Sequence, residues 1–513
     1  MTDLPWHGWI GNTGKPASRG SFDRWSSRLL FYSMGSLLIM IRLTILCCCL
    51  LLTSEMLPAD RPNVVWIISD DLSPELGCYG YPGVDTPHID RLAAAGTRYT
   101  RAFSTAPVCS ASRTAFQTGR YQTTVGGHHH NTRDKRDLPD SIPTITELMR
   151  QAGYFVSNGR GIVEKKLAKS HFNFVYDPRT YFDGTDWSQR KEGQPFFAQV
   201  QIKEPHRTFV KSDRARPDSP IPPYYPDHPV TRADWANYLA SIEVLDRRVG
   251  EILDRLEREG VADNTLVLFF GDHGRPHVRG KQWLYEGGLH VPLIVRWPGK
   301  VAANQVNSEL VSLLDMMPTT LAAAGADGYE ELPGIDLLDA NRDRHQCLFA
   351  ARDRCGDAAD RIRSVRTDRW KYIRNFHPEI PYLQHSGYKK ISYPVETVMK
   401  VLHARGEWDS PFMSDTRPEE ELYDLENDPN EMNNLADDPK QSAKLAELRG
   451  LVREWIQTTG DKGAIDESKT VDLDALRDEK WNYYEKAMKR RGLEPGLSDL
   501  EYLEWWKQEL GVE

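Results

Sequence analysis

Pro62-Asn63-Val64-Val65-Trp66-Ile67-Ile68-Ser69-Asp70-Asp71 is a short apolar run that ends in two adjacent carboxylates. An unbroken run of β-branched and aromatic residues is typical of a parallel strand that is buried on both faces. Open α/β sheets place their functional groups at the carboxyl ends of such strands. A single Asp there commonly caps a helix or lies in a solvated turn, but two adjacent like charges need a cation. The stretch therefore predicts a buried strand of an α/β sheet with a metal site at its end.

A second stretch repeats this pattern. Asn264-Thr265-Leu266-Val267-Leu268-Phe269-Phe270 is another apolar run, and Gly271, Asp272 and His273 follow it. An imidazole nitrogen is a slightly soft ligand for a hard cation such as Ca²⁺. The pattern predicts a second buried strand with residues of metal-ligand type at its tip.

Pro107-Val108-Cys109-Ser110-Ala111-Ser112-Arg113-Thr114-Ala115-Phe116-Gln117-Thr118-Gly119-Arg120 predicts a short helix. Ser110 is the expected cap, and Gly119 provides a left-handed stop. Cys109 then lies at the helix N-terminus, where free N–H groups and the helix dipole favour a nucleophile or an anion. Arg113 is four residues on and shares a face with Cys109, an arrangement that suits a tetrahedral oxyanion. The simpler interpretation is a small buried Cys and a surface Arg.

The composition limits the classes of function. The chain has 513 residues, of which 40% are hydrophobic, enough for a large core and more than one layer or domain. Its formal net charge is -9, so a polyanion has to be bound through local basic pockets, and nucleic acid is not expected as a partner.

The N-terminal region contains an apolar run from Ile39 to Leu52, followed by polar Thr53-Ser54-Glu55. We interpret it as a secretory signal with cleavage near Ala59, because it is too short for a stable membrane span. Met34 or Met40 would make a more ordinary start for such a signal. The expected location is periplasmic or extracellular, and a lipoprotein anchor at Cys47-Cys48-Cys49 is a minor alternative.

Four cysteines remain after that cleavage: Cys78, Cys109, Cys347 and Cys355. In an oxidising compartment Cys347 and Cys355 could close a small loop, although the sequence leaves their pairing open. Three adjacent histidines, His128 to His130, lack a second group of zinc ligands. We expect a polar loop that lines a pocket, with one of these histidines near the substrate.

Cys109-Ser-Ala-Ser-Arg113 followed by Thr118-Gly119-Arg120 resembles the signature of the type I sulfatases. In that family the Cys is oxidised after translation to formylglycine, whose hydrate is the nucleophile. Residues 63–71 resemble the family's first strand, whose Asp pair binds calcium, and Gly271–Gly274 and Arg279–Lys281 resemble later family segments. The resemblance spans Pro62 to Leu435, with the motifs in family order.

The resemblance implies an alkaline-phosphatase-like α/β fold: a mostly parallel sheet flanked by helices, with a smaller α+β C-terminal subdomain that contains an antiparallel sheet. We expect an N-terminal extension and signal peptide over 1–59 and a catalytic domain over 60–340. The C-terminal subdomain then covers 341–460. A charged, Trp-rich helical extension covers 461–513 and packs back on the body.

The resemblance also implies the site residues. One Ca²⁺ would be held by Asp70, Asp71, Asp272 and His273, together with the formylglycine made from Cys109. The sulfate would be neutralised by Arg113, Lys169 and Lys281. His206 (with Lys281) would protonate the leaving oxygen or nitrogen, and His171 or an Asp would deprotonate the second hydroxyl of the hydrate.

Two of these assignments rest on an imperfect match. Lys169 and His171 fit a Lys-x-His element, but an apparent insertion over 159–168 precedes them, and Ala168 replaces the expected Gly. His206 follows Glu204-Pro205 at the end of a predicted strand, where the family keeps a catalytic histidine.

The implied function is a sulfatase that acts on a sulfated polysaccharide or oligosaccharide after activation by a formylglycine-generating enzyme. Residues 349–375 look like bacterial proteins grouped with heparan N-sulfatase, which favours N-sulfoglucosamine, whereas Lys281 is typical of O-sulfatases.

The alternatives are an O-sulfate ester hydrolase on another polysaccharide, or an arylsulfatase. A phosphohydrolase of the same superfamily would carry Ser or Thr as nucleophile and two zinc sites. A glycan-binding protein with an unconverted Cys109 is the non-enzymatic alternative.

Overall fold

The computed structural model describes residues 61–513 except 215, 217–218 and 329–330. Chain contacts divide the protein into two units, Met1–Leu57 and Pro58–Glu513, and the description below concerns the second. The predicted signal segment from Ile39 to Leu52, with cleavage near Ala59, lies outside the described residues. Among the described helices none is both long and apolar enough to cross a membrane.

The larger sheet has eight strands in the order β3-β4-β1-β5-β6-β2-β7, with β8 paired to β2. Strands β3, β4, β1 and β5 are mutually parallel, and the antiparallel β6 joins them to β2. The strands are β1 (Asn63–Ser69), β2 (Thr97–Phe103), β3 (Phe155–Gly159), β4 (Phe196–Ile202), β5 (Thr265–Gly271), β6 (His290–Arg296), β7 (Gln305–Asn307) and β8 (Val311–Ser312).

Strand β1 is central, and all seven of its residues are buried. Because side chains alternate along a strand, its residues enter two separate cores. Val65 and Ile67 pack in the core that contains α6, whereas Val64, Trp66 and Ile68 pack in the opposite core. This explains why β1 is a continuous apolar run, and it confirms the prediction of a buried parallel strand.

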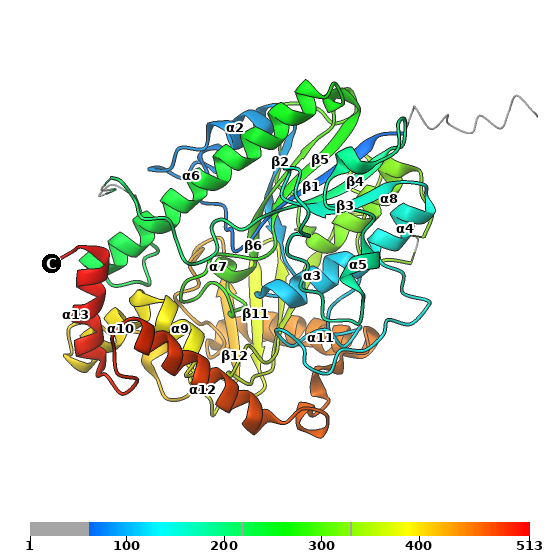
Figure 1. Ribbon diagram of the computed structural model, residues 1–513. Coiled ribbons are helices and arrows are strands. Elements are labelled where there is room, and N and C mark those ends of the chain that lie inside the picture. Colours follow the sequence, from blue (N-terminus) through cyan, green and yellow to red (C-terminus); the bar gives the residue numbers. More distant parts are fainter. Residues whose placement is uncertain (1–60, 215, 217–218, 329–330) are drawn as a thin grey trace, which may run out of the picture. The chain divides into compact units, whose positions relative to one another are not determined.

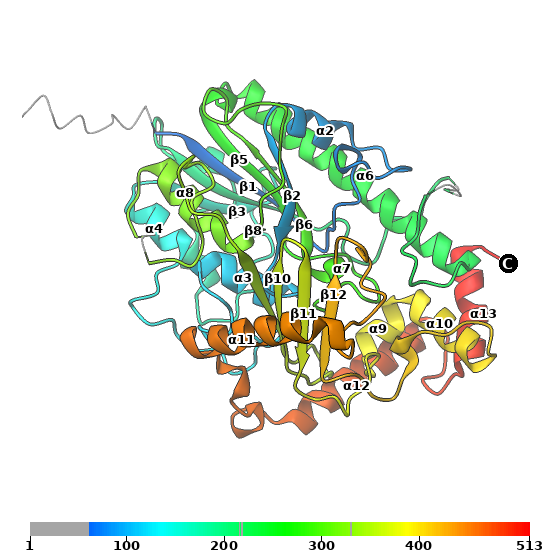
Figure 2. The same cartoon turned by 180° about the vertical axis from the view of Figure 1, so that it is seen from behind.

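Helices cover both faces of this sheet (Figures 1 and 2). One face carries α2 (Pro87–Ala94) and the long α6 (Pro229–Arg258), which pack against each other. The other face carries α3 (Cys109–Thr118), α4 (Ile145–Gln151) and α8 (Met316–Ala324). Two short helices, α5 (Pro178–Tyr181) and α7 (Glu286–Leu289), lie in connecting segments.

The smaller sheet is antiparallel, with the order β12-β11-β10-β9. Its strands are β9 (Cys347–Arg352), β10 (Ile362–Thr367), β11 (Trp370–Asn375) and β12 (Glu420–Asp424). Helix α11 (Ser442–Thr458) lies across it, as Figure 2 shows, and its Leu445, Leu448 and Val452 pack on Val365 and Tyr372. The two sheets confirm the predicted fold class.

Four further helices pack together beside α6: α9 (Gly387–Ser392), α10 (Pro394–Ala404), α12 (Leu473–Arg490) and α13 (Asp499–Leu510), of which α10 and α13 contact α6. Their shared apolar cluster includes Val398, Tyr484, Met488 and Trp506. Helix α12 packs on α9, and α13 packs on α6 and α10.

Two details correct the expectations from sequence, and a third confirms one. Ser110 is not the cap of α3, because the cap position is Val108 and Ser110 Oγ instead accepts a hydrogen bond from the backbone N–H of Asn131. Cys347 and Cys355 are free thiols, so the small disulfide loop is absent. Gly119 does adopt the left-handed conformation, with φ 62°, and ends α3 as predicted.

The basic residues of 349–375 are mostly ion-paired and buried in the smaller sheet. Arg352 pairs with Asp360, Arg363 pairs with Asp353 and Asp461, and Lys371 pairs with Glu286 and Glu431. These cations therefore stabilise the C-terminal part of the chain and do not form an open basic surface.

Candidate active site

The two runs of candidate metal ligands meet because their strands are neighbours. In the parallel pair of β1 and β5, Ser69 lies opposite Gly271, so the next residues of both strands emerge at the same edge of the sheet. The backbone N–H of Asp71 donates a 3.0 Å hydrogen bond to Asp272 Oδ1 and fixes the two loops to each other. Asp71 itself has a φ of 64°, a left-handed conformation that a non-glycine residue rarely adopts. Such strained residues are concentrated at functional sites.

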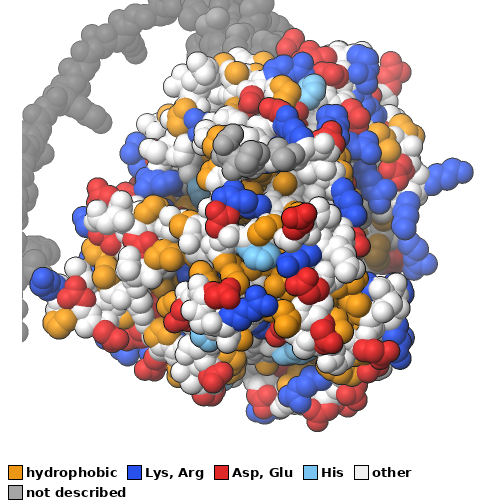
Figure 3. Space-filling model, turned by 90° about the vertical axis from the view of Figure 1, so that its left-hand side faces the viewer, with side chains coloured by type: hydrophobic (Ala, Val, Ile, Leu, Met, Phe, Trp, Pro, Cys, Tyr) orange, Lys and Arg blue, Asp and Glu red, His pale blue; other side chains and the backbone are white. Residues whose placement is uncertain are grey.

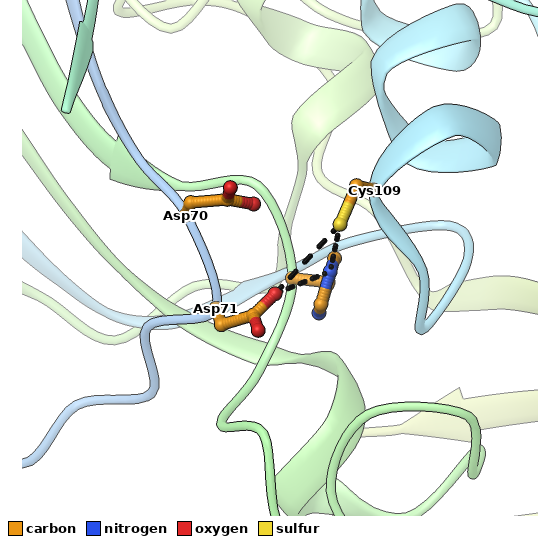
Figure 4. A group of neighbouring side chains, drawn as sticks. Asp70, Asp71 and Cys109 are labelled. Carbon is orange, nitrogen blue, oxygen red and sulfur yellow. Dashed lines mark hydrogen bonds and ion pairs between the residues drawn. The ribbon is translucent and has the colours of Figure 1, made fainter. Parts of the chain in front are cut away.

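The N-terminus of α3 points Cys109 at these strand ends (Figure 4). The Cys109 sulfur lies 3.2 Å from His273 Nε2, 3.7 Å from Asp71 Oδ1 and 3.3 Å from the Lys281 ammonium. The thiol is buried, with 3% of the residue exposed. Cys109 therefore lies inside the charged cluster and is not a small hydrophobe of the core.

Four of the predicted metal ligands are close enough to bind one ion. One potential ligand atom from each of Asp70, Asp71, Cys109 and His273 lies within 4.8 Å of the others. Asp70 Oδ1 is buried and accepts no hydrogen bond from the described residues, which is costly for a carboxylate unless a cation compensates it. This unpartnered oxygen and the second carboxylate fit a divalent cation.

Asp272 lies beside this group, with its Oδ1 3.7 Å from His273 Nε2. Both of its oxygens already accept hydrogen bonds, Oδ1 from Asp71 and Oδ2 from Arg113. A carboxylate oxygen has a second lone pair, so these bonds do not prevent metal ligation. Its role as a ligand stays a prediction.

Arg113 is buried and faces three acceptor side chains. Its Nε donates to Asp272 at 2.9 Å, one Nη donates to Gln201 Oε1 at 2.6 Å, and the other Nη lies 3.8 Å from Asp70. Only 1% of the residue is exposed. Gln201 was not predicted from the sequence, although a glutamine near the end of a strand buried on both faces is a usable signal.

Two lysines approach the cluster from opposite sides. The Lys169 ammonium lies 2.5 Å from Asp70 Oδ2, so the insertion over 159–168 does not displace it from the site. The Lys281 ammonium lies 2.8 Å and 3.0 Å from the two oxygens of Asp71. Lys281 is buried, whereas the Lys169 side chain is 23% exposed, so Lys169 lies on the solvent side.

These ion pairs control protonation. Burial alone would raise the pKa of both Asp70 and Asp71, but Lys169 and Lys281 respectively hold the two pKa values well below the usual range. Burial alone would lower the pKa of Lys281, but Asp71 holds it well above its usual value. The site therefore carries fixed negative and positive charges at neutral pH, as the binding of a cation beside an anionic group requires.

The histidines differ in position. His206 Nε2 lies 3.8 Å from Asp71 Oδ2, and burial lowers the pKa of His206 despite that carboxylate. His171 lies at the exposed edge of the site, where partial desolvation of its ring and the charge of Lys169 lower its pKa to about 4. His130 lines a cavity next to the site, as predicted for this loop, and burial with Lys281 lowers its pKa.

Family models identify the chain. The model of the family described as Sulfatase matches residues 62–326, which is more than half of the chain and includes Cys109, both strand ends and Lys281. The chain belongs to the sulfatase family. A second model, described as N-sulphoglucosamine sulphohydrolase, C-terminal, matches residues 271–383 of this sulfatase. The enzyme is therefore a hydrolase of sulfate esters or sulfamates.

Individual relatives agree with the family models. The sulfatase is similar to an ulvan-active sulfatase of Formosa agariphila, with 30% identity, over 82% of this chain and 78% of that protein. It is also similar to human N-sulphoglucosamine sulphohydrolase, with 27% identity, over 81% of this chain and 94% of that protein. A solved structure of a putative sulfatase from Bacteroides thetaiotaomicron shares the fold, with TM-score 0.58, 21% identity and coverage of 80% and 94%.

Proposed function

We propose that this sulfatase removes sulfate groups from a sulfated polysaccharide or oligosaccharide by means of a formylglycine made from Cys109 and one bound Ca²⁺. The observation that carries the proposal is the position of Cys109 Sγ, 3.2 Å from His273 Nε2 and 3.3 Å from the Lys281 ammonium. A buried side chain at a helix N-terminus, between a metal-type cluster and a fixed cation, is placed to attack an anionic group.

The residues that would hold the ion are Asp70, Asp71, Asp272, His273 and position 109. When bound, Ca²⁺ supplies positive charge that favours the ionised form of a hydroxyl on the formylglycine hydrate. Conversion of Cys109 requires a separate formylglycine-generating enzyme, which is the maturation partner that we propose.

The chain's own cations bind and orient the sulfate. Arg113, Lys169 and Lys281 offer N–H donors on several sides of position 109, and their charges oppose the negative charge that develops on the sulfate oxygens. Their ion pairs with Asp70, Asp71 and Asp272 hold them in place before substrate arrives. Little reorganisation is then needed during the reaction.

Proton transfer would be carried out by histidines at the open side of the site. His206 is 24% exposed at its side chain, and the charge of Asp71 beside it favours the protonated ring, which would donate a proton to the leaving oxygen or nitrogen. His171, with its lowered pKa, is neutral near pH 7 and can accept a proton. An Asp of the cluster is the alternative acceptor for the second hydroxyl.

Two substrate linkages are supported by different relatives. The match of residues 271–383 to the C-terminal model of N-sulphoglucosamine sulphohydrolase supports an N-sulfo group on glucosamine. The 30% identity to an ulvan-active sulfatase supports an O-sulfate ester on another polysaccharide. The shared chemistry is a sulfated sugar.

We further propose that the protein acts in the periplasm or outside the cell, as the apolar run from Ile39 to Leu52 suggests.

The test is release of inorganic sulfate from defined N-sulfated and O-sulfated oligosaccharides of glucosamine and from ulvan oligosaccharides. The full chain is co-expressed with a formylglycine-generating enzyme, and the mass of the peptide that contains position 109 reports its conversion. Release by the converted protein, and none by Cys109→Ala, is the expected result. The preferred oligosaccharide then distinguishes sulfamate from ester.

Three outcomes would contradict the proposal. Release of phosphate in place of sulfate would indicate a phosphohydrolase. Binding of the oligosaccharides without release, by a chain whose Cys109 stays a thiol despite the maturation enzyme, would indicate a glycan-binding protein. Cleavage of small aryl sulfates alone would indicate an arylsulfatase.

A further inference from the structure

A cavity of about 210 Å³ lies beside the cluster and is not used by the mechanism above. Its walls come from five separate parts of the chain: the loop after α3, the segment after Lys281, the segment after β9, the start of α9, and α12. Residues that line it include His130, Gln282, Arg354, Ser386, Tyr388 and Tyr483.

The cavity is connected to the reacting centre on two sides. Gln282 follows Lys281 in the chain, and the Lys281 ammonium lies 5.7 Å from the centre of the Tyr388 ring. The backbone N–H of Asn131 also donates to Ser110 Oγ at 2.8 Å, so this part of the wall is fixed to the residue next to Cys109. A molecule in the cavity is therefore adjacent to any group bound at position 109.

Three buried polar atoms of the wall have no hydrogen-bond partner among the described residues: Gln282 Oε1, Ser386 Oγ and the Tyr388 hydroxyl. Gln282 and Ser386 are only 4% and 2% exposed. Buried polar atoms without partners are rare in proteins, because each costs free energy unless a ligand or water satisfies it. Convergent groups of this kind fit the hydroxyls of a sugar ring.

The rim carries an aromatic ring and two cations that share a single exposed carboxylate. Tyr483 of α12 is 47% exposed, so its ring is free to pack against a sugar face. Arg133, Arg354 and Lys480 line the cavity, against one carboxylate, Asp357. Arg354 is held by both oxygens of Glu467, but Arg133 and Lys480 share the exposed Glu479, at 2.6 Å and 3.0 Å.

Helix α12 is held against the cavity by close packing. A side chain at Gly387 would meet Tyr484 Cβ at 3.1 Å, so the glycine permits α9 to lie directly on α12. The segment before α12 is anchored by the paired bonds of Arg363 to Asp461, at 2.6 Å and 2.9 Å. The rim residues of α12 are therefore presented in a fixed position.

We propose that this cavity is a glycan subsite whose outer wall is the C-terminal helix α12, and that it selects a sugar unit bearing an acidic group. The inference rests on the proposed function, because it names the sugar environment of the sulfate that the enzyme removes. Arg133 and Lys480 bind the acidic group at the rim, in place of Glu479. Tyr483 packs on the ring, and Gln282, Ser386 and Tyr388 bind the hydroxyls.

The surface of the molecule is consistent with a local basic site. On the face in Figure 3, acidic and basic side chains are interspersed over most of the surface, and several basic side chains lie along its right-hand edge. With a net charge of -9, recognition of an acidic sugar has to come from a short-range arrangement such as this rim.

The test compares a sulfated disaccharide that contains a uronic acid with the same disaccharide after reduction of the carboxyl group. We expect Lys480→Met to lower the ratio of kcat/KM for the acidic over the reduced substrate about tenfold, the loss of one charge-assisted contact. Lys489→Met, on the same helix but away from the cavity, is the matched control and should leave the ratio unchanged. An unchanged ratio in Lys480→Met would overturn the inference.

A second measurement does not depend on turnover. Calorimetry follows binding of the desulfated acidic disaccharide to the full chain carrying Cys109→Ala, with and without Lys480→Met. Binding that is weakened about tenfold by Lys480→Met supports the subsite even if no sulfate is released. Absence of sulfate release alone would contradict only the proposed function. Absence of binding, or binding that Lys480→Met does not change, would overturn the subsite even if sulfate is released.

Discussion

Arg113 donates a 2.9 Å hydrogen bond from Nε to Asp272 Oδ2, and this bond joins the helix that carries Cys109 to the end of strand β5. Neither partner is exposed to solvent. Because the same guanidinium also donates to Gln201 and faces Asp70, one side chain links α3 to the ends of three neighbouring strands. The relative position of the nucleophile and the metal-type carboxylates therefore depends on a planar, multidentate cation.

Replacement of that cation tests its geometry. Arg113→Lys keeps the charge but removes the fork of donors, so Asp272 and Gln201 cannot both be satisfied. We expect kcat/KM for sulfate release to fall roughly 10²–10³-fold, the cost of losing a buried donor at a charged transition state. Arg179→Lys, which alters an exposed pair with Asp177, is the control and should be close to wild type. Similar activities for the two variants would show that a positive charge at position 113 is sufficient for activity without the fork of donors.

Metal binding should depend on Asp70. Its buried Oδ1 accepts no hydrogen bond from the described residues, so a bound cation stabilises the folded state and not the unfolded one. We expect Ca²⁺ to raise the Tm of the wild type, a chelator to reverse the effect, and Asp70→Asn to abolish it. At a Ca²⁺ concentration 100 times Kd the stabilisation is about 2.7 kcal/mol. Asp474→Asn, at an exposed position, should retain the full response, and a response retained by Asp70→Asn would refute this assignment.

The C-terminal extension should depend on a buried ion network. Arg363 is fully buried and binds Asp461 and Asp353, so Arg363→Met leaves two carboxylates without their cation. The expected loss in the free energy of unfolding is about 3–5 kcal/mol, measured by denaturant titration. Arg369→Met removes a half-exposed cation, paired with Asp424 of the same sheet, and should change stability little. Equal losses in the free energy of unfolding would contradict the claim that the buried Arg363 contributes more to stability than the half-exposed Arg369.

Lys389 should make the free energy of unfolding depend on pH in the alkaline range. Burial lowers the pKa of Lys389 from 10.5 to about 8, so between these pH values the unfolded chain holds a proton that the folded chain has lost. The free energy of unfolding therefore rises with pH across that window, by ~3 kcal/mol. Below about pH 8 the folded state carries the full cost of burying the charged ammonium.

Lys389→Met removes the cost of burying a charged ammonium and keeps an apolar stem of similar length. We expect the variant to be more stable than the wild type at pH 7, with a difference that shrinks as the pH rises from about 8 to about 10.5. Thermal unfolding at a series of pH values measures this difference, and Lys390→Met is the control on the same helix. A difference that does not vary with pH would show that burial does not shift the pKa of Lys389.

Several parts of the site follow from local sequence. The apolar runs that end at Asp70 and at Asp272 predict buried strands, because burial on both faces requires an unbroken hydrophobic sequence. Cys109 and Arg113 share a helix face because their spacing is one turn, and Gly119 ends that helix because glycine adopts positive φ at little cost. These features depend on residues that are close together in the chain.

Other parts were decided by tertiary contacts. The cap expected at Ser110 is absent because that hydroxyl instead accepts a bond from Asn131, and no local pattern reveals such a partner. Lys169 reaches Asp70 despite the insertion before it, since the packing of the loop and not its length determines where the ammonium lies.

By itself the sequence determined the fold class, the family resemblance and the residues around Cys109, because strands, helix ends and motif spacing are encoded over a few residues. Only the tertiary structure showed that Gln201 fixes Arg113, and that Tyr388 and α12 enclose a cavity beside Lys281. The physical reason is that these contacts join residues from separate elements. Their proximity depends on how two sheets and the C-terminal helices pack, which no local pattern of residues specifies.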